Sequence, residues 1–245
     1  MAKKRHDAAA DALIKGEMDV ELVTRLTELI YSNLIREDRF RLLFDGLGLT
    51  LQITLYALCM GVVIGVVIAV ARIMKIKILS QIAQFYVDII RGTPIVVQLV
   101  IIYYAVLADS SLPKTMVASI AFAINCGAYV SELIRGGSLA VDKGQMEAAR
   151  SLGLSWFQSM RFVVIPQAVK NILPALVNEA IALLKETAIA GYIALDDLTR
   201  AGNIIRSVNF DPYTPFLIVA IIYLYCTTTL SVFAGMLERR LRASD

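Results

Sequence analysis

The sequence predicts an all-α integral membrane protein, with five transmembrane helices that follow an N-terminal amphipathic segment. Apolar residues make up 58% of the 245 residues and charged residues 18%, whereas soluble domains have about 45–50% and about 25%. The mean hydropathy of +0.67 agrees with this bias. Five apolar stretches, each long enough to cross about 30 Å of hydrocarbon, follow one another after residue 46. These observations exclude a disordered chain or a disulfide scaffold and disfavour an ordinary soluble enzyme.

The first 46 residues form a polar leader with a different composition. They contain 8 Lys and Arg and 9 Asp and Glu, and they lack the apolar core of a signal peptide. Within Val20–Ile35 the apolar residues Val23, Leu26 and Ile30 recur at helical spacing. We expect an amphipathic helix here, lying on the membrane surface or against the helix bundle. The alternative is a partly disordered arm.

The predicted membrane domain covers residues 47–238, and residues 239–245 form a tail. The second stretch contains Asp88 and Arg91 and is interrupted at Gly92-Thr93-Pro94, because proline disfavours helix in the preceding residue and lacks a donor. We expect a broken helix there, with freed carbonyl groups that could face a cavity. The five predicted spans are Leu47–Ala71, Ile82–Ala108, Thr115–Ile134, Phe162–Leu184 and Pro215–Leu237.

Basic residues in the loops predict the orientation, because Lys and Arg accumulate on the cytoplasmic side. The other side would hold only Lys114, Arg200 and Arg206, so we expect the N-terminus outside the cell and the C-terminus in the cytoplasm. Arg36, Arg39 and Arg41, close to the first span, oppose this orientation. The ten basic residues predicted to be cytoplasmic are Arg72, Lys75, Lys77, Arg135, Lys143, Arg150, Arg161, Arg239, Arg240 and Arg242.

Two sequence features bear on packing and on chemistry. Gly61-x-x-x-Gly65 in the first span would allow another helix backbone to approach closely. The three cysteines lie in apolar stretches and the single histidine, His6, lies in the leader, so neither a metal site nor a histidine-based catalytic triad can be assembled. The chain also lacks a GxxxxGK[ST] phosphate-binding loop. We therefore expect no metal, no cofactor and no ATPase site in this chain.

The loop between the third and fourth spans, about residues 136–166, predicts a short helix on the cytoplasmic face. Residues 146–152 are good helix formers, and Gly153 is a natural stop. Ser155 and Gln158 form a capping-box pattern that would begin another helix. A short helix with two alanines on one side and charged flanks can insert into a groove of another protein.

This loop resembles the EAA loop of ATP-binding-cassette (ABC) importer permeases. Glu147-Ala148-Ala149, three intervening residues, Gly153, nine intervening residues and then Val163-Val164-Ile165-Pro166 depart from the family pattern only by Val for Ile and Ile for Leu. Further elements are similar to the polar amino acid subfamily and extend the resemblance over roughly residues 46–238. These are Arg91-Gly92-Thr93-Pro94 with Gln98-Leu99, Ala128-Tyr129 with Glu132 and Arg135-Gly136-Gly137, Gly144-Gln145, Pro166-Gln167-Ala168, Pro174, Asn178 and Leu184-Lys185-Glu186-Thr187.

The resemblance implies a type I importer permease, a transport subunit in the bacterial inner membrane rather than an enzyme. Its partners would be ATP-binding-cassette ATPase subunits, which bind ATP and Mg²⁺, a second permease copy or a paralogue, and an extracellular substrate-binding protein. It would contact membrane lipid and polar amino acids but no nucleic acid. The EAA helix would couple the ATPase to the permease through Gly144, Glu147, Ala148, Ala149, Arg150 and Gly153.

Candidate substrate-pathway residues are polar groups within the predicted spans, where a charge exposed to lipid is costly. A zwitterionic amino acid needs an acceptor for its ammonium and a donor for its carboxylate, which Glu179 and Lys185 could supply. Both residues could instead pair with other helices for structural reasons, and Glu132 with Arg135 is better interpreted as such a structural pair. The remaining candidates are Thr93, Gln98, Asn125, Tyr129 and Asn178.

Two other classes of membrane protein compete with an ATP-coupled amino acid importer. An ion-gradient-driven secondary amino acid transporter would need an internal repeat or ion-site carboxylates, but the first two spans do not resemble the last two. An intramembrane enzyme would need a nucleophile and a base, and the sequence offers no such pair. The identity of the transported side chain does not follow from the sequence.

Overall fold

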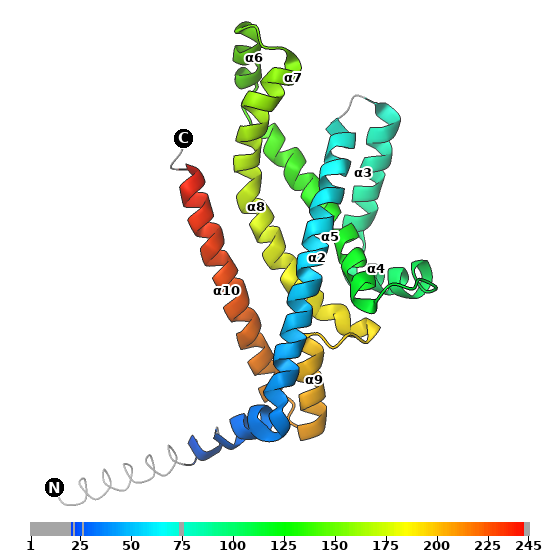
Figure 1. Cartoon of the computed structure of the whole chain (residues 1–245), viewed down its shortest axis with the longest axis vertical. Helices are drawn as coiled ribbons and strands as arrows, with labels where there is room; N and C mark the ends of the chain where they lie inside the picture. The colour runs from blue at the N-terminus through cyan, green and yellow to red at the C-terminus, as the bar shows by residue number, and fades with distance from the viewer. Residues whose placement is uncertain (1–20, 22, 26, 74–75, 243–245) are drawn as a thin grey trace, which may run out of the picture.

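The structure, a computed structural model, describes residues 21, 23–25, 27–73 and 76–242 and is helical throughout its regular elements (Figure 1). The predicted all-α class is therefore confirmed. The elements are η1 (Tyr31–Ile35), η2 (Arg36–Asp38), α2 (Arg39–Ile73), α3 (Lys77–Gly92), α4 (Ile95–Ile101), η3 (Ile102–Val106), α5 (Lys114–Leu139), α6 (Lys143–Ser151), α7 (Trp156–Ser159), η4 (Met160–Val164), α8 (Ile165–Glu186), η5 (Thr187–Ile193), α9 (Leu198–Asn209) and α10 (Thr214–Arg242).

The described residues provide three helices that are long and apolar enough to cross a membrane. These are Val23–Ile73, Lys114–Leu139 and Thr214–Arg240, and the bent pair Lys77–Gly92 and Ile95–Val106 would make a fourth if it is one span. The predicted fourth span, α8, is not among them, because its 22 residues include Lys170, Asn178, Glu179 and Lys185. The count of five spans therefore stays a prediction, which requires α8 to bury these groups against other helices.

The predicted break in the second apolar stretch is present. Thr93 has extended backbone angles, and Pro94 precedes α4, so the chain turns by 108° between α3 and the α4–η3 segment. A proline at this position fits, since the first turn of a helix has no intrahelical acceptor for its N–H groups. The predicted span Ile82–Ala108 therefore consists of two helical segments, α3 and α4–η3, joined by a sharp bend. The α4–η3 segment packs against α5 (Figure 1).

Glycines allow α2 and α5 to pack closely in the centre of the bundle. A Cβ added to Gly65 would lie 2.5 Å from Cγ1 of Val130, and one added to Gly61 would lie 2.8 Å from Cys126. Gly127 on α5 is equally tight against Ile64. The predicted packing role of the Gly61 and Gly65 motif is confirmed. The core that this contact organises includes fully buried Ile53 and Phe122.

We expect Gly65→Ala to destabilise the protein, because the added methyl group would overlap Val130. Such overpacking costs about 1–3 kcal/mol. Gly48→Ala is the matched control on the same helix, since a Cβ there meets nothing within 4 Å, and alanine favours helix by about 1 kcal/mol over glycine. Thermal unfolding of the purified protein in detergent should give a lower Tm for Gly65→Ala only. Equal Tm values for the two variants would contradict the close α2–α5 contact.

The leader joins the bundle through a buried polar cluster near the start of α2. Asn33 and Arg39 are 0% and 5% exposed. Asn33 donates to Asp211 at 3.0 Å, and Asn209 donates back to Asn33 at 2.8 Å. Arg39 donates to the carbonyl of Ser32 at 2.7 Å and also bonds Asn209. The junction between leader and α2 is thus attached to the connection between α9 and α10.

This cluster modifies two expectations about the leader. The long helix α2 begins at Arg39 rather than near Leu47, so residues 39–46 continue the first span as helix. The described residues within 21–30 are helical, and Val20 and Leu26 lie outside the described residues. Val23 and Ile30 are 62% and 51% exposed, so placement of this helix on the membrane surface or against the bundle stays a prediction. Arg39, one of the basic residues that opposed the predicted orientation, is used inside this cluster and is shielded from solvent.

Candidate functional site

The loop between α5 and α8 folds as the sequence predicts. Asp142 caps α6, its side chain accepting from the N–H of Gly144, and α6 ends before Gly153, whose φ of +87° suits glycine. Ser155 and Gln158 form both hydrogen bonds of a capping box that begins α7. The short helix, its glycine stop and the capping box are therefore confirmed. Figure 1 shows α6 and α7 at the far end of the bundle from α9.

Burial divides the candidate coupling residues between two faces of α6. Gly144, Glu147, Ala148, Arg150 and Gly153 are exposed, whereas Ala149 is only 4% exposed. The expectation that both alanines lie on the face offered to a partner is wrong, because consecutive helical residues point about 100° apart. Ala149 packs inward on its own loop, and Ala148 is the small residue on the outer face.

Large exposed apolar side chains follow α6 in the same loop, and the sequence argument did not single them out. Leu152 is 85% exposed, and Trp156 and Phe157 are 59% and 67% exposed. Their position in the sequence could have indicated them, because they lie in a polar loop rather than in an apolar stretch. Exposed apolar groups of this size commonly mark a surface where another protein binds.

The helix break brings three predicted pathway residues into one hydrogen-bonded chain. The Gln98 amide donates to the hydroxyl of Thr93 at 2.7 Å and to the carbonyl of Ile90 at 2.7 Å, and Asn125 donates to Gln98 at 2.9 Å. Gln98 also donates to the carbonyl of Thr93 at 3.1 Å. The carbonyl groups freed by the break are thus satisfied by Gln98, which fixes the angle between α3 and α4. Both Gln98 and Asn125 are buried.

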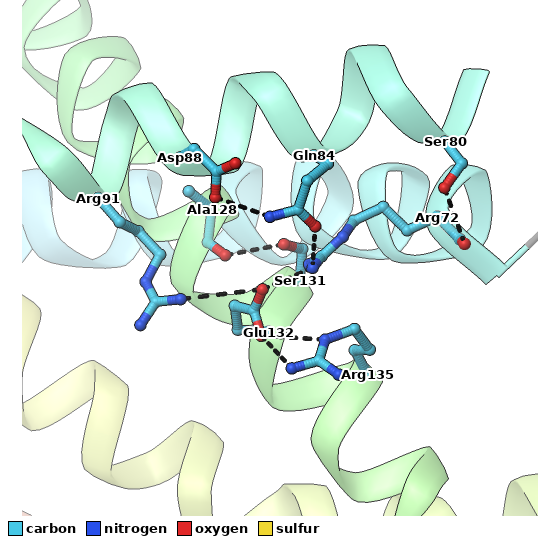
Figure 2. A network of polar contacts seen from close by, with 9 residues as sticks. All are labelled: Arg72, Ser80, Gln84, Asp88, Arg91, Ala128, Ser131, Glu132 and Arg135. Carbon is cyan, nitrogen blue, oxygen red and sulfur yellow. Dashed lines mark hydrogen bonds and ion pairs between the residues drawn. The ribbon is translucent and has the colours of Figure 1, made fainter. Parts of the chain in front are cut away.

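Three arginines from three helices or helix segments converge on Glu132 (Figure 2). Arg72 of α2 lies 2.6 Å from Glu132 and donates to Gln84 at 2.6 Å. Arg135 of α5 makes two hydrogen bonds to the same carboxylate, at 2.8 and 3.1 Å. The predicted Glu132–Arg135 pair is confirmed, and Arg72 was the member that sequence reasoning missed. The network joins α2, α3 and α5 at one end of the bundle.

The third arginine, Arg91, lies at the end of α3 just before the break and is held more loosely. Its guanidinium lies 3.8 Å from Glu132 and over the ring of Tyr129, 5.3 Å from the ring centre. Tyr129, a predicted pathway residue, is thereby placed beside Arg91. Sequence reasoning used Arg91 only as part of the motif at the break, although a charged residue inside an apolar stretch was the available signal.

The predicted residues on α8 occupy its second half. Asn178 is exposed and Glu179 is half-buried, and Glu179 interacts electrostatically with Arg91 and Glu186. Lys185 is exposed and interacts electrostatically with Glu186. Glu179 therefore lies within electrostatic range of Arg91. It records no direct pair between Glu179 and Lys185 among the described residues.

Two cavities differ sharply in character. The larger, about 840 Å³, lies between α2, α5 and α8 and is lined by apolar side chains apart from Ser138, so it offers nothing to a polar solute. The smaller, about 280 Å³, lies between η5 and α9 and is bordered by Asp197, Thr199, Arg200 and Asn203. The polar groups that could meet a solute within the predicted spans therefore lie elsewhere, around Arg91.

Asp197 begins α9 and is fully buried, with its carboxylate accepting from the N–H groups of Thr199 and Arg200. Burial raises its pKa to about 6, and these hydrogen bonds offset only part of that rise. A pKa higher in the folded than in the unfolded chain means that the folded state is favoured most when Asp197 is protonated. This contribution is complete below about pH 4 and is lost as the pH rises through about 6.

We expect Asp197→Asn to remove this pH dependence, because asparagine caps a helix without a titrating group. A shift of this size corresponds to about 3 kcal/mol between pH 4 and pH 7.5. The difference in Tm between parent and variant, measured across that range in detergent, should therefore change with pH. The variant should gain relative stability toward neutral pH. A difference independent of pH would contradict the raised pKa.

Comparison with known proteins places these features in context. A family model described as binding-protein-dependent transport system inner membrane component matches residues 61–243. The arginine transport system permease protein ArtQ of Bacillus subtilis is 37% identical over 83% of this chain and 94% of its own length. The glutamine transport system permease protein GlnP of Escherichia coli is 37% identical over 82% and 93%. A chain in a crystal structure of an amino acid ABC transporter with histidines is 46% identical, with a TM-score of 0.77 over 82% of this chain and 94% of that chain.

Proposed function

Because the chain belongs to the family of binding-protein-dependent transport system inner membrane components, we propose that it is the permease subunit of an ABC importer for polar amino acids. The observation that carries this proposal is the combination of an exposed EAA helix, α6, with a broken apolar helix and polar groups inside the bundle. The motif resemblance and the relatives agree on this family. Nothing among them supports a secondary transporter.

In this proposal the chain hydrolyses no ATP itself. ATP and Mg²⁺ are bound by separate ATPase subunits, which receive α6 through the exposed residues Gly144, Glu147, Ala148, Arg150 and Gly153. Ala149 supports α6 from within its loop. A second permease copy or paralogue completes the pathway, and an extracellular binding protein delivers the amino acid. ATP binding and hydrolysis would favour alternate packings of the bundle.

The proposed substrate path runs beside the helix break. Thr93, Gln98 and Asn125 hold its shape, Tyr129 lines it, and Glu179 accepts the ammonium of the amino acid. Asn178 and Lys185 are exposed side chains in the second half of the same helix, α8, and a substrate would meet them on its way to Glu179. A carboxylate on a membrane helix is costly unless a cationic or hydrogen-bonding group meets it, and a passing ammonium meets that requirement.

Transport by the reconstituted complex tests the proposed function. Permease, ATPase and binding protein are assembled in proteoliposomes, and uptake of radiolabelled L-arginine, L-glutamine and L-histidine is measured. Uptake should require both ATP and the binding protein, and it should persist when an ionophore collapses ion gradients. Uptake that continues without ATP but stops with the ionophore would instead establish the secondary transporter. Absence of uptake of any amino acid would refute the proposed function.

We also propose that the end of the bundle with α6 faces the cytoplasm and that the leader and α9 face outward. Single cysteines are placed in a background lacking Cys59, Cys126 and Cys226. A cysteine at Ser111 or Ser207, both exposed, should react with an impermeant thiol reagent in intact cells. One at Ser151 on α6 should react only after lysis. The reversed pattern would overturn the orientation.

A further inference from the structure

Arg91 differs from the other two arginines around Glu132 in having an available guanidinium. The Arg72 and Arg135 side chains each place a nitrogen within 2.8 Å of Glu132. Arg91 lies 3.8 Å from it, and no hydrogen bond joins Arg91 to any acceptor in the part of the chain that the structure describes. Its side chain is 44% exposed. A guanidinium has five N–H donors in a fork that matches a carboxylate, so Arg91 retains its full capacity for one.

The surroundings of Arg91 hold its guanidinium in place without using its donors. The ring of Tyr129 lies under it at 5.3 Å, a distance at which a cation and an aromatic face attract. Glu132, already bonded to Arg72 and Arg135, supplies a nearby negative charge from one side (Figure 2). An arginine oriented in this way loses little conformational freedom when it binds an anion.

Glu179, on α8, provides a charge of opposite sign within electrostatic range of Arg91. The two side chains therefore offer a donor beside the break between α3 and α4 and an acceptor on a different helix, within electrostatic range of each other. Lys185, the donor that the sequence suggested, is exposed at the end of α8 and interacts with Glu186. Arg91 is thus better placed than Lys185 to act together with Glu179.

We propose that Arg91 binds the α-carboxylate of the transported amino acid while Glu179 receives its α-ammonium group. This proposal rests on the proposed function and names the part of the substrate that the site recognises. Both groups are shared by all amino acids, so the pair selects the zwitterionic backbone and leaves the side chain to other residues. A planar guanidinium fork can bind both carboxylate oxygens at once, which the ammonium of Lys185 cannot do.

The test compares each amino acid with its α-carboxamide, which keeps the ammonium group but lacks the carboxylate. Binding of L-arginine, L-glutamine and L-histidine, and of their α-carboxamides, is measured on the purified permease–ATPase complex without the binding protein. The unsubstituted complex should bind at least one acid about tenfold or more tightly than its amide, the usual worth of a hydrogen bond to a charged group. Arg91→Gln should lose that preference, by weakening the acid and leaving the amide unchanged.

Arg135→Gln is the matched control, because it removes another cation from Glu132 while leaving the Arg91 guanidinium and the Tyr129 ring in the chain. It should retain the preference for acid over amide. Arg91→Lys, which keeps the charge, should recover part of the preference. Such recovery would show that the loss in Arg91→Gln does not come from misfolding. The proposal is overturned if Arg91→Gln and the unsubstituted complex prefer acid over amide by the same factor. It is also overturned if a complex that transports amino acids with its binding protein shows no acid preference. Loss of transport altogether would refute the proposed function instead.

Discussion

Replacing Ala148 by tryptophan should separate the permease from its ATPase. Ala148 lies on the exposed face of α6, next to Glu147, so a large side chain there enters no space inside the permease. It would instead occupy the space that a partner needs for close approach. The few central residues that dominate an interface cost about 2 kcal/mol or more when they are changed. We therefore expect ATPase co-purification to fall at least about tenfold and ATP-driven uptake to reach background.

The neighbouring alanine supplies the control that isolates this effect. Ala149 is buried in its own loop, so Ala149→Trp should overpack that loop and lower the Tm of the permease. Ala148→Trp should leave the Tm unchanged, and Ala148→Ser should retain association. The docking role of α6 would be contradicted if Ala148→Trp assembled and transported normally. It would be contradicted equally if both tryptophan variants lost stability to the same extent.

Glu179→Gln should preserve the fold and remove most transport. Glutamine keeps the size and hydrogen-bonding capacity of the side chain but lacks the negative charge that an ammonium group requires. Losing a hydrogen bond to a charged group costs about 1.5–3 kcal/mol, so we expect uptake in proteoliposomes to fall about tenfold or more. The ATPase of the assembled complex should still respond to the loaded binding protein.

Asp88→Asn is the matched control for removing a carboxylate from a helix of the bundle. Asp88 is exposed on α3 and accepts a hydrogen bond from Gln84, which asparagine can replace. This variant should transport at the parental rate. Unchanged uptake by Glu179→Gln would show that Glu179 takes no part in transport. Failure of that variant to assemble would show instead that Glu179 satisfies a neighbouring helix.

In the α5–α8 loop, the ends of the short helices are set by residues only a few positions apart in the sequence. Gly153, Ser155 and Gln158 specify the end of one helix and the start of the next through backbone angles and short-range hydrogen bonds. Such features depend on residues a few positions apart, and they were predictable in detail. Which face of α6 points outward could not be predicted in this way, because the burial of Ala149 depends on contacts formed when the whole loop folds.

In the charged network around Glu132, helical spacing predicts contacts within one helix but not contacts between helices. Glu132 and Arg135 lie three residues apart on one helix, so their pairing followed from helical spacing. Arg72 is sixty residues away in sequence, and its contact with Glu132 exists only because glycines bring α2 against α5. The apparent partnership of Glu179 with Lys185 had the same weakness. Two residues along one helix were paired without knowing which other helix faced them.

By itself the sequence determined that this protein is an all-helical membrane permease, where its second apolar stretch breaks, and which loop resembles a coupling loop. These properties follow from composition, apolar length, proline and glycine positions and motif spacing, all of which act over short stretches of chain. Only the tertiary structure decided that Gln98 satisfies the broken helix, that Ala149 is buried, and that Arg91 lies beside Tyr129 and within electrostatic range of Glu179. Those facts depend on the relative positions of α3, α4, α5 and α8, which are set by side-chain packing between residues far apart in the sequence.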